Sequence, residues 1–161
     1  MTPFSIETAR LRLRPYTPEE AGLVAAGTRR QNHWSPGFPR PDDQDIARLY
    51  LATSPGEPMF GPLQIVLLSN DLVIGGIGFF GPPDETGTVE VGYGVAPEVE
   101  GRGYATEALL ALLHHGFTDG RVRQALADTA RDNLASQRVL EKAGLRRKSS
   151  DENLHYYAIE G

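Results

Sequence analysis

The chain has 161 residues, which is long enough for one domain with a hydrophobic core that needs no disulfides or metal ions. Its net charge of −5 provides no global basic field, so the composition does not favour nucleic acid as a partner. It contains no cysteine, which excludes a disulfide framework, a thiol nucleophile and a thiolate metal site. No apolar run reaches membrane-spanning length and the N-terminus lacks a signal-peptide core, so we expect a cytoplasmic protein that does not bind membranes.

The N-terminal third is expected to contain a strand and two short helices. Residues 6–15 are predicted to form a polar edge followed by a strand, in which leucines alternate with arginines and one face is solvated. Thr17 is followed by a proline and, three residues on, by Glu20, which is the order of an N-cap, a first helical residue and a capping-box partner. This helix is predicted to end near Gly27, and a second one to occupy residues 42–51.

A loop rich in proline and glycine connects these two helices over residues 29–43, and it carries His33, Trp34 and Phe38. An aromatic loop beside an active cleft often contacts substrate. Packing of the aromatic rings into the protein interior explains the same residues equally well. We therefore treat the three residues as a candidate substrate loop, with packing as the alternative.

Two apolar runs follow at residues 60–68 and 72–80, and a three-residue connection between them predicts a hairpin. The second run contains a formal match to the dinucleotide-binding fingerprint, starting at Gly76. We reject this match, because a true fingerprint opens a helix, whereas these glycines lie inside a strand and two prolines follow. Glycines within a strand indicate a bulge or a close approach of another group to the backbone.

The centre of the chain predicts a strand, a glycine-rich turn and a helix. Residues 87–95 alternate apolar with other side chains, and from Tyr104 onward apolar residues recur at helical spacing. Gly101 and Gly103 directly precede this helix. Such a turn leaves backbone N–H groups free in a concave surface, and the helix dipole adds positive potential there. The pattern therefore predicts a phosphate-binding site.

The C-terminal part predicts a strand at residues 124–129, a helix that starts at an Asx cap and ends at Gly144, and a final pair of strands at residues 145–150 and 154–159. No linker or internal repeat divides the chain. We expect one domain over residues 1–161, of the mixed α/β class, with a central mixed sheet flanked by helices.

Three segments carry a resemblance to a known family. They are EGRGYATEA from Glu100, NLASQRVLEKAGL from Asn133 and, at the N-terminus, ETARLRLRPYTPEEA from Glu7. Together with the order of elements, they resemble the GNAT superfamily of acyl-CoA-dependent N-acyltransferases. Within it, the chain is most similar to the branch that includes the ribosomal-protein alanine N-acetyltransferases.

The resemblance implies a GNAT-like acyl-CoA N-acyltransferase fold with acetyl-CoA as co-substrate and no metal. In this family backbone amides of the turn hold the pyrophosphate, and the central strand separates from the next so that pantetheine pairs with its backbone. Asn133 would contact the pantetheine arm or only cap its helix, and the two roles are compatible. The cofactor-binding positions implied by the resemblance are Tyr93, Gly94, Val95, Glu100, Gly101, Arg102, Gly103, Tyr104, Ala105, Asn133 and Ser136.

The sequence departs from the family pattern at two positions. Glu100 stands where the family commonly has Gln or Arg, so its carboxylate is expected to point away from the pyrophosphate. Leu140 stands where many members have the tyrosine that reprotonates the leaving thiolate. The resembled branch implicates a serine at the position of Ser136, and this serine is present. Because a serine is a weak acid, we expect it to hydrogen-bond the thiolate or to relay a proton through water. Which group finally supplies the proton stays open.

Acyl transfer to an amine needs a base, because a typical alkylamine is protonated at pH 7. Glu90 is the candidate, since strand alternation places it on the central strand opposite the apolar positions, and the resembled branch often has Glu at the matching point. A solvated strand residue without a catalytic role is the alternative. A backbone N–H on the separated strand would polarise the thioester oxygen.

These observations predict an N-acyltransferase that moves an acetyl group from acetyl-CoA to a primary amine by direct attack on the thioester. The acceptor would be a protein N-terminus or a small-molecule amine. The alternative is a non-catalytic module that binds acyl-CoA as a sensor or scaffold, and Leu140 favours it. The four histidines show no spacing typical of a metal site. An exposed edge at the C-terminal strands would allow a homodimer.

Overall fold

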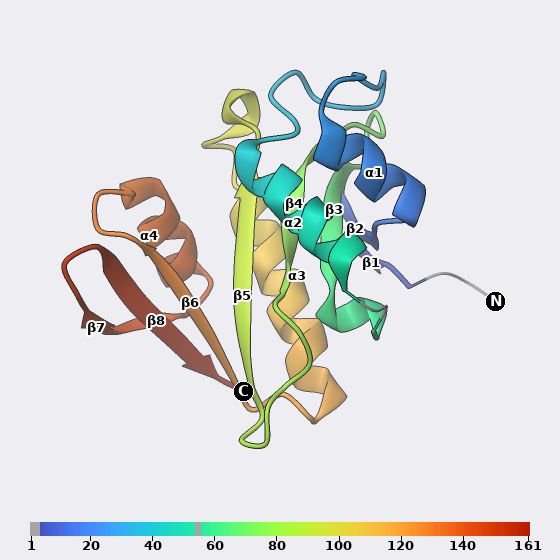
Figure 1. Cartoon of the computed structure of the whole chain (residues 1–161). Helices are drawn as coiled ribbons and strands as arrows, with labels where there is room; N and C mark the ends of the chain where they lie inside the picture. The colour runs from blue at the N-terminus through green and yellow to red at the C-terminus, as the bar shows by residue number, and fades with distance from the viewer. Residues whose placement is uncertain (1–3, 54–55) are drawn as a thin grey trace.

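The fold is described from a computed structural model, over residues 4–53 and 56–161 (Figure 1). The strands are β1 (Ile6–Glu7), β2 (Leu11–Pro15), β3 (Pro62–Leu67), β4 (Val73–Phe79), β5 (Thr88–Val95), β6 (Gln124–Ala130), β7 (Arg146–Ser150) and β8 (Leu154–Glu160). The helices are α1 (Pro18–Ala26), α2 (Pro41–Ala52), α3 (Tyr104–Asp119) and α4 (Leu134–Lys142), with short 3-10 turns η1 (Pro58–Phe60) and η2 (Pro97–Val99).

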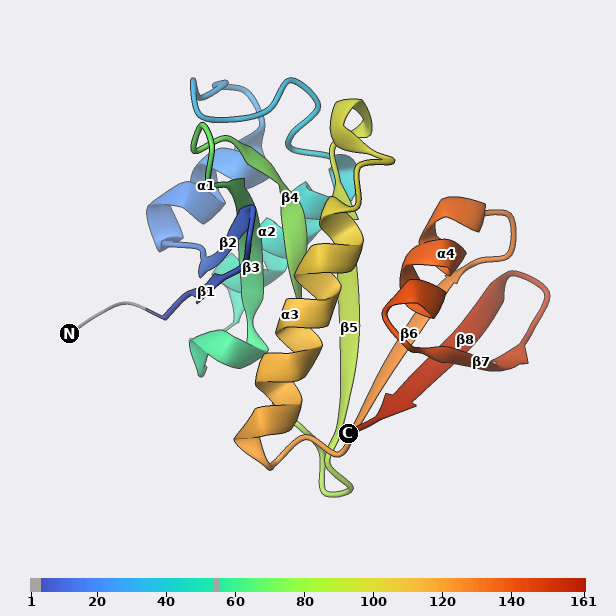
Figure 2. The same cartoon turned by 180° about the vertical axis from the view of Figure 1, so that it is seen from behind.

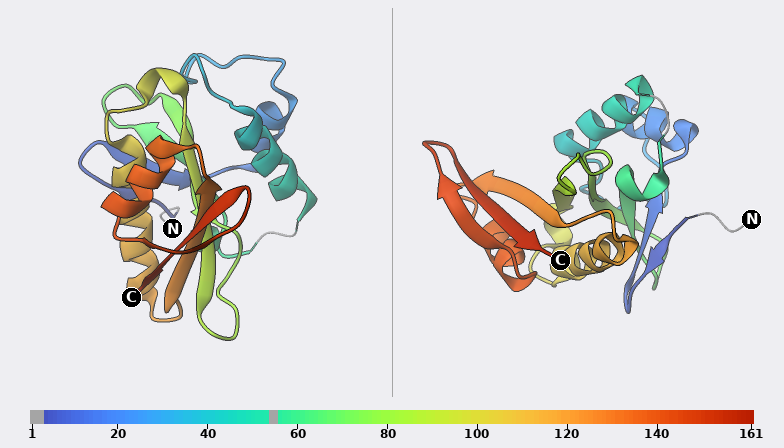
Figure 3. Two further views of the ribbon diagram at one scale, coloured as in Figure 1. Left: turned by 90° about the vertical axis from the view of Figure 1, so that its left-hand side faces the viewer. Right: turned by 90° about the horizontal axis from the view of Figure 1, so that it is seen from below.

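The strands form one sheet in the order β1-β2-β3-β4-β5-β6-β8-β7. Neighbouring strands are antiparallel except for β5 and β6, which are parallel. Helices α1 and α2 cover one face, and α3 and α4 lie on the other, as the front and back views show (Figures 1 and 2). The view from below shows these layers edge-on (Figure 3). The predicted α/β class, with a central mixed sheet flanked by helices, is confirmed.

The strand predicted after the polar edge is present as β2. The edge itself forms the additional short strand β1, which pairs antiparallel with β2 and places Ile6 opposite Leu13. The chain reverses at Thr8, whose backbone N–H donates to the Leu11 carbonyl at 2.9 Å and whose hydroxyl accepts from the Leu11 N–H at 3.0 Å. Side-chain hydrogen bonds of this kind compete with a continuous strand ladder, and alternation of leucine and arginine does not reveal them.

Helix α1 begins and ends where its sequence signals predict. The Glu20 N–H donates to the Thr17 hydroxyl at 3.1 Å, and the Thr17 N–H donates to the Glu20 carboxylate at 3.0 Å, which completes a capping box. Gly27 closes the helix in the left-handed conformation, with φ of 65°. In the described part of the chain, no helix is long and apolar enough to cross a membrane.

Hydrophobic side chains fill two separate regions of the interior. The larger cluster includes the fully buried Leu109 and Leu112 of α3, which pack against the sheet. The smaller cluster involves α1 and α2 and contains Val24, Trp34 and Phe38. This double-sided core holds the central strands rigid between helices, so that groups on either face keep fixed positions.

Strands β5 and β6 are paired over a short stretch and then separate. Their register runs from Thr88 opposite Gln124 to Glu90 opposite Leu126. Beyond Glu90, β5 stays paired with β4 as far as Val95, and β6 stays paired with β8. The two strands therefore diverge like the arms of a V, which is open in both the front and back views (Figures 1 and 2). The separation implied by the resemblance is present.

Candidate active site

The glycine turn follows the open end of β5 and leads into α3. Gly101 and Gly103 have φ of 78° and 83°, a left-handed conformation that suits glycine. Gly103 is the N-cap of α3, and no side chain of the described residues caps this end. The first-turn N–H groups are thus free to hold an anion, and the helix dipole favours one there. Glu100 and Arg102 are both exposed.

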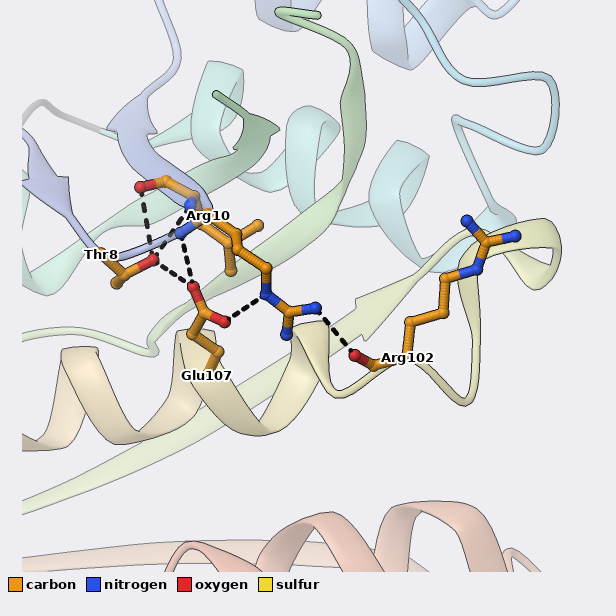
Figure 4. Close-up of polar contacts among 5 residues, drawn as sticks. Thr8, Arg10, Arg102 and Glu107 are labelled. Atoms are coloured by element: carbon orange, nitrogen blue, oxygen red, sulfur yellow. Dashed lines mark hydrogen bonds and ion pairs between the residues drawn. The ribbon is translucent and has the colours of Figure 1, made fainter. Parts of the chain in front are cut away.

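A network of hydrogen bonds ties this turn to the N-terminal hairpin (Figure 4). Glu107, in the first turn of α3, accepts from the Thr8 hydroxyl at 2.5 Å and from the Arg10 side chain at 2.7 Å. Arg10 also donates to the Arg102 carbonyl at 3.0 Å, and its guanidinium lies 4.4 Å from the centre of the Tyr104 ring. The Arg102 guanidinium points away from the network (Figure 4). Arg10 was predicted only as part of a solvated strand face, yet it fixes the backbone of the turn.

The network makes stability depend on the charge of Glu107. Burial alone would raise the pKa of Glu107, but hydrogen bonds from Thr8 and Arg10 hold the pKa below its usual value. A carboxyl group with a lowered pKa stabilises the fold above its unfolded-state pKa, and this contribution is lost as the pH falls through the folded-state pKa. At pH 7 we expect Glu107→Gln to reduce the free energy of unfolding by about 1 kcal/mol or less, since the group is partly solvated.

Below about pH 5 the difference between parent and Glu107→Gln should shrink, because the unfolded parent binds a proton that the folded carboxylate does not bind until the pH reaches its lowered pKa. Urea unfolding of both proteins at several pH values between about 7 and about 3 measures this difference. A difference that stays constant over the range would show that the carboxylate charge does not hold the turn.

Tyr93 and Ser136 meet between β5 and α4. The Tyr93 hydroxyl lies 2.8 Å from the Ser136 hydroxyl and donates to the Ser136 carbonyl at 3.1 Å. Burial raises the pKa of Tyr93 to about 12, although the hydrogen bond with Ser136 lowers it in part. Asn133 accepts from the Ser136 N–H at 3.1 Å and so caps α4. Leu140 is fully buried, and its side chain has no group that could donate a proton at this site.

Glu90 lies at the point where β5 and β6 separate, since Glu90 and Leu126 form the last pair of the parallel register. Its side chain is exposed, whereas its neighbours Val89 and Val91 are buried. Alternation directs Glu90 to the sheet face of α2, opposite to the face of Tyr93. The two predicted catalytic residues, Glu90 and Ser136, therefore lie on opposite faces of the sheet.

The aromatic loop contributes mainly to packing. Trp34 is 5% exposed and Phe38 is fully buried, and their rings meet edge to face with centroids 5.7 Å apart. This placement favours the packing alternative for these two residues of the candidate substrate loop. His33 is exposed.

Glu98 links this loop to the segment before the glycine turn, which the sequence did not reveal. Its carboxylate accepts from the Ser35 hydroxyl and from the Gly37 N–H, the latter at 2.7 Å. The hydrogen bond from Ser35 lowers the pKa of Glu98, and the N–H of Gly37 adds to this effect. These hydrogen bonds attach the loop to η2, and the glycine turn follows η2 in the chain.

A glycine turn at a helix N-terminus beside two separating parallel strands is the arrangement expected of an acyl-CoA-dependent transferase. The family pattern described as the acetyltransferase (GNAT) domain matches residues 10–146, and the chain belongs to this family. The predicted family membership is confirmed.

Relatives and solved structures agree with this assignment. The chain is 35% identical over 106 residues to the uncharacterized N-acetyltransferase YjdG of Bacillus subtilis (strain 168). The matched region covers 65% of this chain and 63% of that relative, which is less than two thirds of the relative's length. The fold resembles ribosomal-protein-S5-alanine acetyltransferase from Vibrio fischeri, with a TM-score of 0.72, 18% identity and coverage of 98% and 96% of the two chains. It also resembles Mycobacterium smegmatis RimJ in complex with CoA-disulfide, with a TM-score of 0.70, 20% identity and coverage of 98% and 88%.

Proposed function

We propose that the protein transfers an acetyl group from acetyl-CoA to a primary amine. The observation that carries this proposal is the position of the glycine turn at the open end of β5, where β5 has left β6. A pyrophosphate held by the turn leaves the pantetheine arm directed into the V between the strands. A CoA-containing complex of a protein with the same fold supports this use of the site.

The reaction forms a bond between the amine nitrogen and the carbonyl carbon and breaks the bond between that carbon and sulfur. Glu90 accepts the proton that the amine must lose, directly or through water. A backbone N–H of β5 near Gly94 polarises the thioester oxygen as it becomes negative. The thiolate leaves with the bonding electrons and takes up a proton from the solvent, and Glu90 returns the proton it accepted to the solvent. Coenzyme A and the N-acetyl product are released.

Ser136 and Tyr93 support departure of the thiolate by hydrogen bonding. A thiol has an ordinary pKa of about 8.5, so a phenol whose pKa is raised to about 12 does not transfer its proton to the thiolate outright. It stays protonated and can orient the Ser136 hydroxyl toward the sulfur. Tyr93 is therefore a positioning residue, which takes part through Ser136.

Ser136→Ala should lower kcat about tenfold, because one hydrogen bond to a charged sulfur is lost. Tyr93→Phe should lower it by a smaller factor, and acetyl-CoA affinity should change little in both variants. Ser149→Ala, at an exposed serine of β7, is the matched control. Steady-state release of free thiol measures these constants. Full activity of Ser136→Ala would remove Ser136 from the reaction.

A binding module without turnover is the second candidate, favoured by the buried Leu140. Free thiol released from acetyl-CoA only when an amine is present supports the transferase. Thermal stabilisation by acetyl-CoA without amine-dependent release supports the sensor or scaffold.

A further inference from the structure

The face of β5 toward α2 has a bare backbone at two positions. Glu90, Gly92 and Gly94 alternate on this face, so that Glu90 alone of the three carries a side chain. A Cβ atom at Gly92 would lie 2.6 Å from the Phe80 ring, and one at Gly94 would overlap the Arg40 guanidinium. The two glycines therefore let an aromatic ring and a cation lie directly on the strand beside Glu90.

Phe80 is placed to contact a ligand. It is 56% exposed and is the only exposed aromatic side chain among the described residues. One part of its ring rests on Gly92, and its backbone N–H donates to the Glu90 carbonyl at 2.9 Å, which fixes it beside the candidate base. An exposed ring held this firmly offers an apolar surface at low entropic cost.

Arg40 supplies a hydrogen-bond donor on the same surface. Its Nε and Nη2 atoms donate to the Asp43 carboxylate at 3.0 and 2.9 Å, and Asp43 is 3% exposed. The Nη1 atom lies over Gly94 and has no hydrogen-bond partner within residues 4–53 and 56–161. The ion pair holds the guanidinium in place and leaves this nitrogen free to bind an oxygen atom.

These groups lie on the other side of the sheet from the glycine turn and Tyr93. Along β5 they follow the order carboxylate, aromatic ring, cation, at steps of about 7 Å for every two residues. The Arg40 guanidinium is fixed over Gly94, and the long side chain of Glu90 can reach along the strand toward a molecule that rests on Phe80. An acceptor entering from this face meets the V at its apex, while the cofactor enters from the opposite face.

We propose that Glu90, Phe80 and Arg40 form the acceptor subsite, and that the acceptor is an aminoacyl compound with an apolar or aromatic side chain. This rests on the proposed acetyl transfer. The side chain packs on Phe80, the carbonyl oxygen accepts from Nη1 of Arg40, and the α-amine faces Glu90. An α-amine also has a pKa of about 7.7–8.0 against about 10.4 for a lysine amine, so a larger fraction is neutral at pH 7.

Three amines test the assignment with acetyl-CoA as donor: phenylalaninamide, glycinamide without the side chain, and 2-phenylethylamine without the carbonyl. In the parent, kcat/KM calculated for the neutral form of each amine should be about tenfold higher for phenylalaninamide than for each analogue. Phe80→Ala should abolish the advantage over glycinamide, and Arg40→Lys, which keeps the charge beside Asp43, should reduce the advantage over 2-phenylethylamine. Leu49→Ala, at an exposed leucine farther along α2, should change neither ratio.

A second readout separates this proposal from the proposed function. Phenylalaninamide should raise the melting temperature of the CoA-bound parent and not that of CoA-bound Phe80→Ala. If no amine supports thiol release but this difference is present, the transferase function fails and the subsite stands. Equal kcat/KM for the three amines would overturn the subsite, and so would kcat/KM ratios that stay unchanged in both variants. If no amine supports thiol release, a melting temperature of the CoA-bound parent that phenylalaninamide does not raise would overturn it as well.

Discussion

Replacing Gly103 with glutamate should weaken acetyl-CoA binding at least about 100-fold. The carboxylate would stand at the N-cap of α3, where the pyrophosphate is expected, and two charges about 4 Å apart near a protein surface repel by about 4 kcal/mol. Part of this repulsion is screened by salt. At a concentration of 100 times the parent's Kd, acetyl-CoA should raise the melting temperature of the parent by about 5–10 °C and that of the variant by about 1–2 °C or less.

Two control variants isolate the charge at this position. Gly120→Glu introduces the same side chain at the other end of α3, where φ is 88°, so it shares the backbone strain without facing the anion site. Gly103→Gln keeps the strain and size at the turn but adds no charge. We expect Gly120→Glu to bind acetyl-CoA like the parent, and Gly103→Gln to bind with intermediate affinity. Loss of binding in Gly120→Glu as well would point to general destabilisation.

Glu90→Gln should lower kcat about 100-fold or more while acetyl-CoA still binds, because a carboxamide cannot take the amine proton. The loss should be smaller at higher pH, where a larger fraction of the amine is already neutral. Steady-state thiol release from pH 6 to 9 measures this. Glu85→Gln removes the same charge from an exposed position and should leave kcat unchanged. An unaltered kcat in Glu90→Gln would exclude Glu90 as the base.

Local sequence patterns predict most of the helices and strands and the conformation of the glycine turn. Thr17 and Glu20 encode a helix start within four residues, and the left-handed Gly101 and Gly103 encode a tight turn at a helix N-terminus. Signals of this kind depend on near neighbours in the chain. For this reason, the element order and the conformation of the glycine turn follow from local sequence, whereas anion binding at the turn stays a prediction.

The remaining features depend on residues that are distant in sequence. The contacts of Arg10 with Glu107 and of Tyr93 with Ser136 join residues that only the tertiary fold brings together. No local pattern specified that Phe80 and Arg40 lie against Gly92 and Gly94. The sequence also did not reveal the reversal at Thr8, because the alternation of leucine and arginine does not encode the hydrogen bonds between Thr8 and Leu11.

Acetyl transfer through the V between β5 and β6 is tested most directly by mass spectrometry of phenylalaninamide incubated with acetyl-CoA and the protein, with free thiol followed in parallel. Transfer predicts an N-acetyl product that appears at the same rate as free coenzyme A, with both slowed together in Glu90→Gln. Release of coenzyme A without acetylated amine, or binding of acetyl-CoA with neither product across a broad panel of primary amines, would contradict a transferase and leave an acyl-CoA-binding protein.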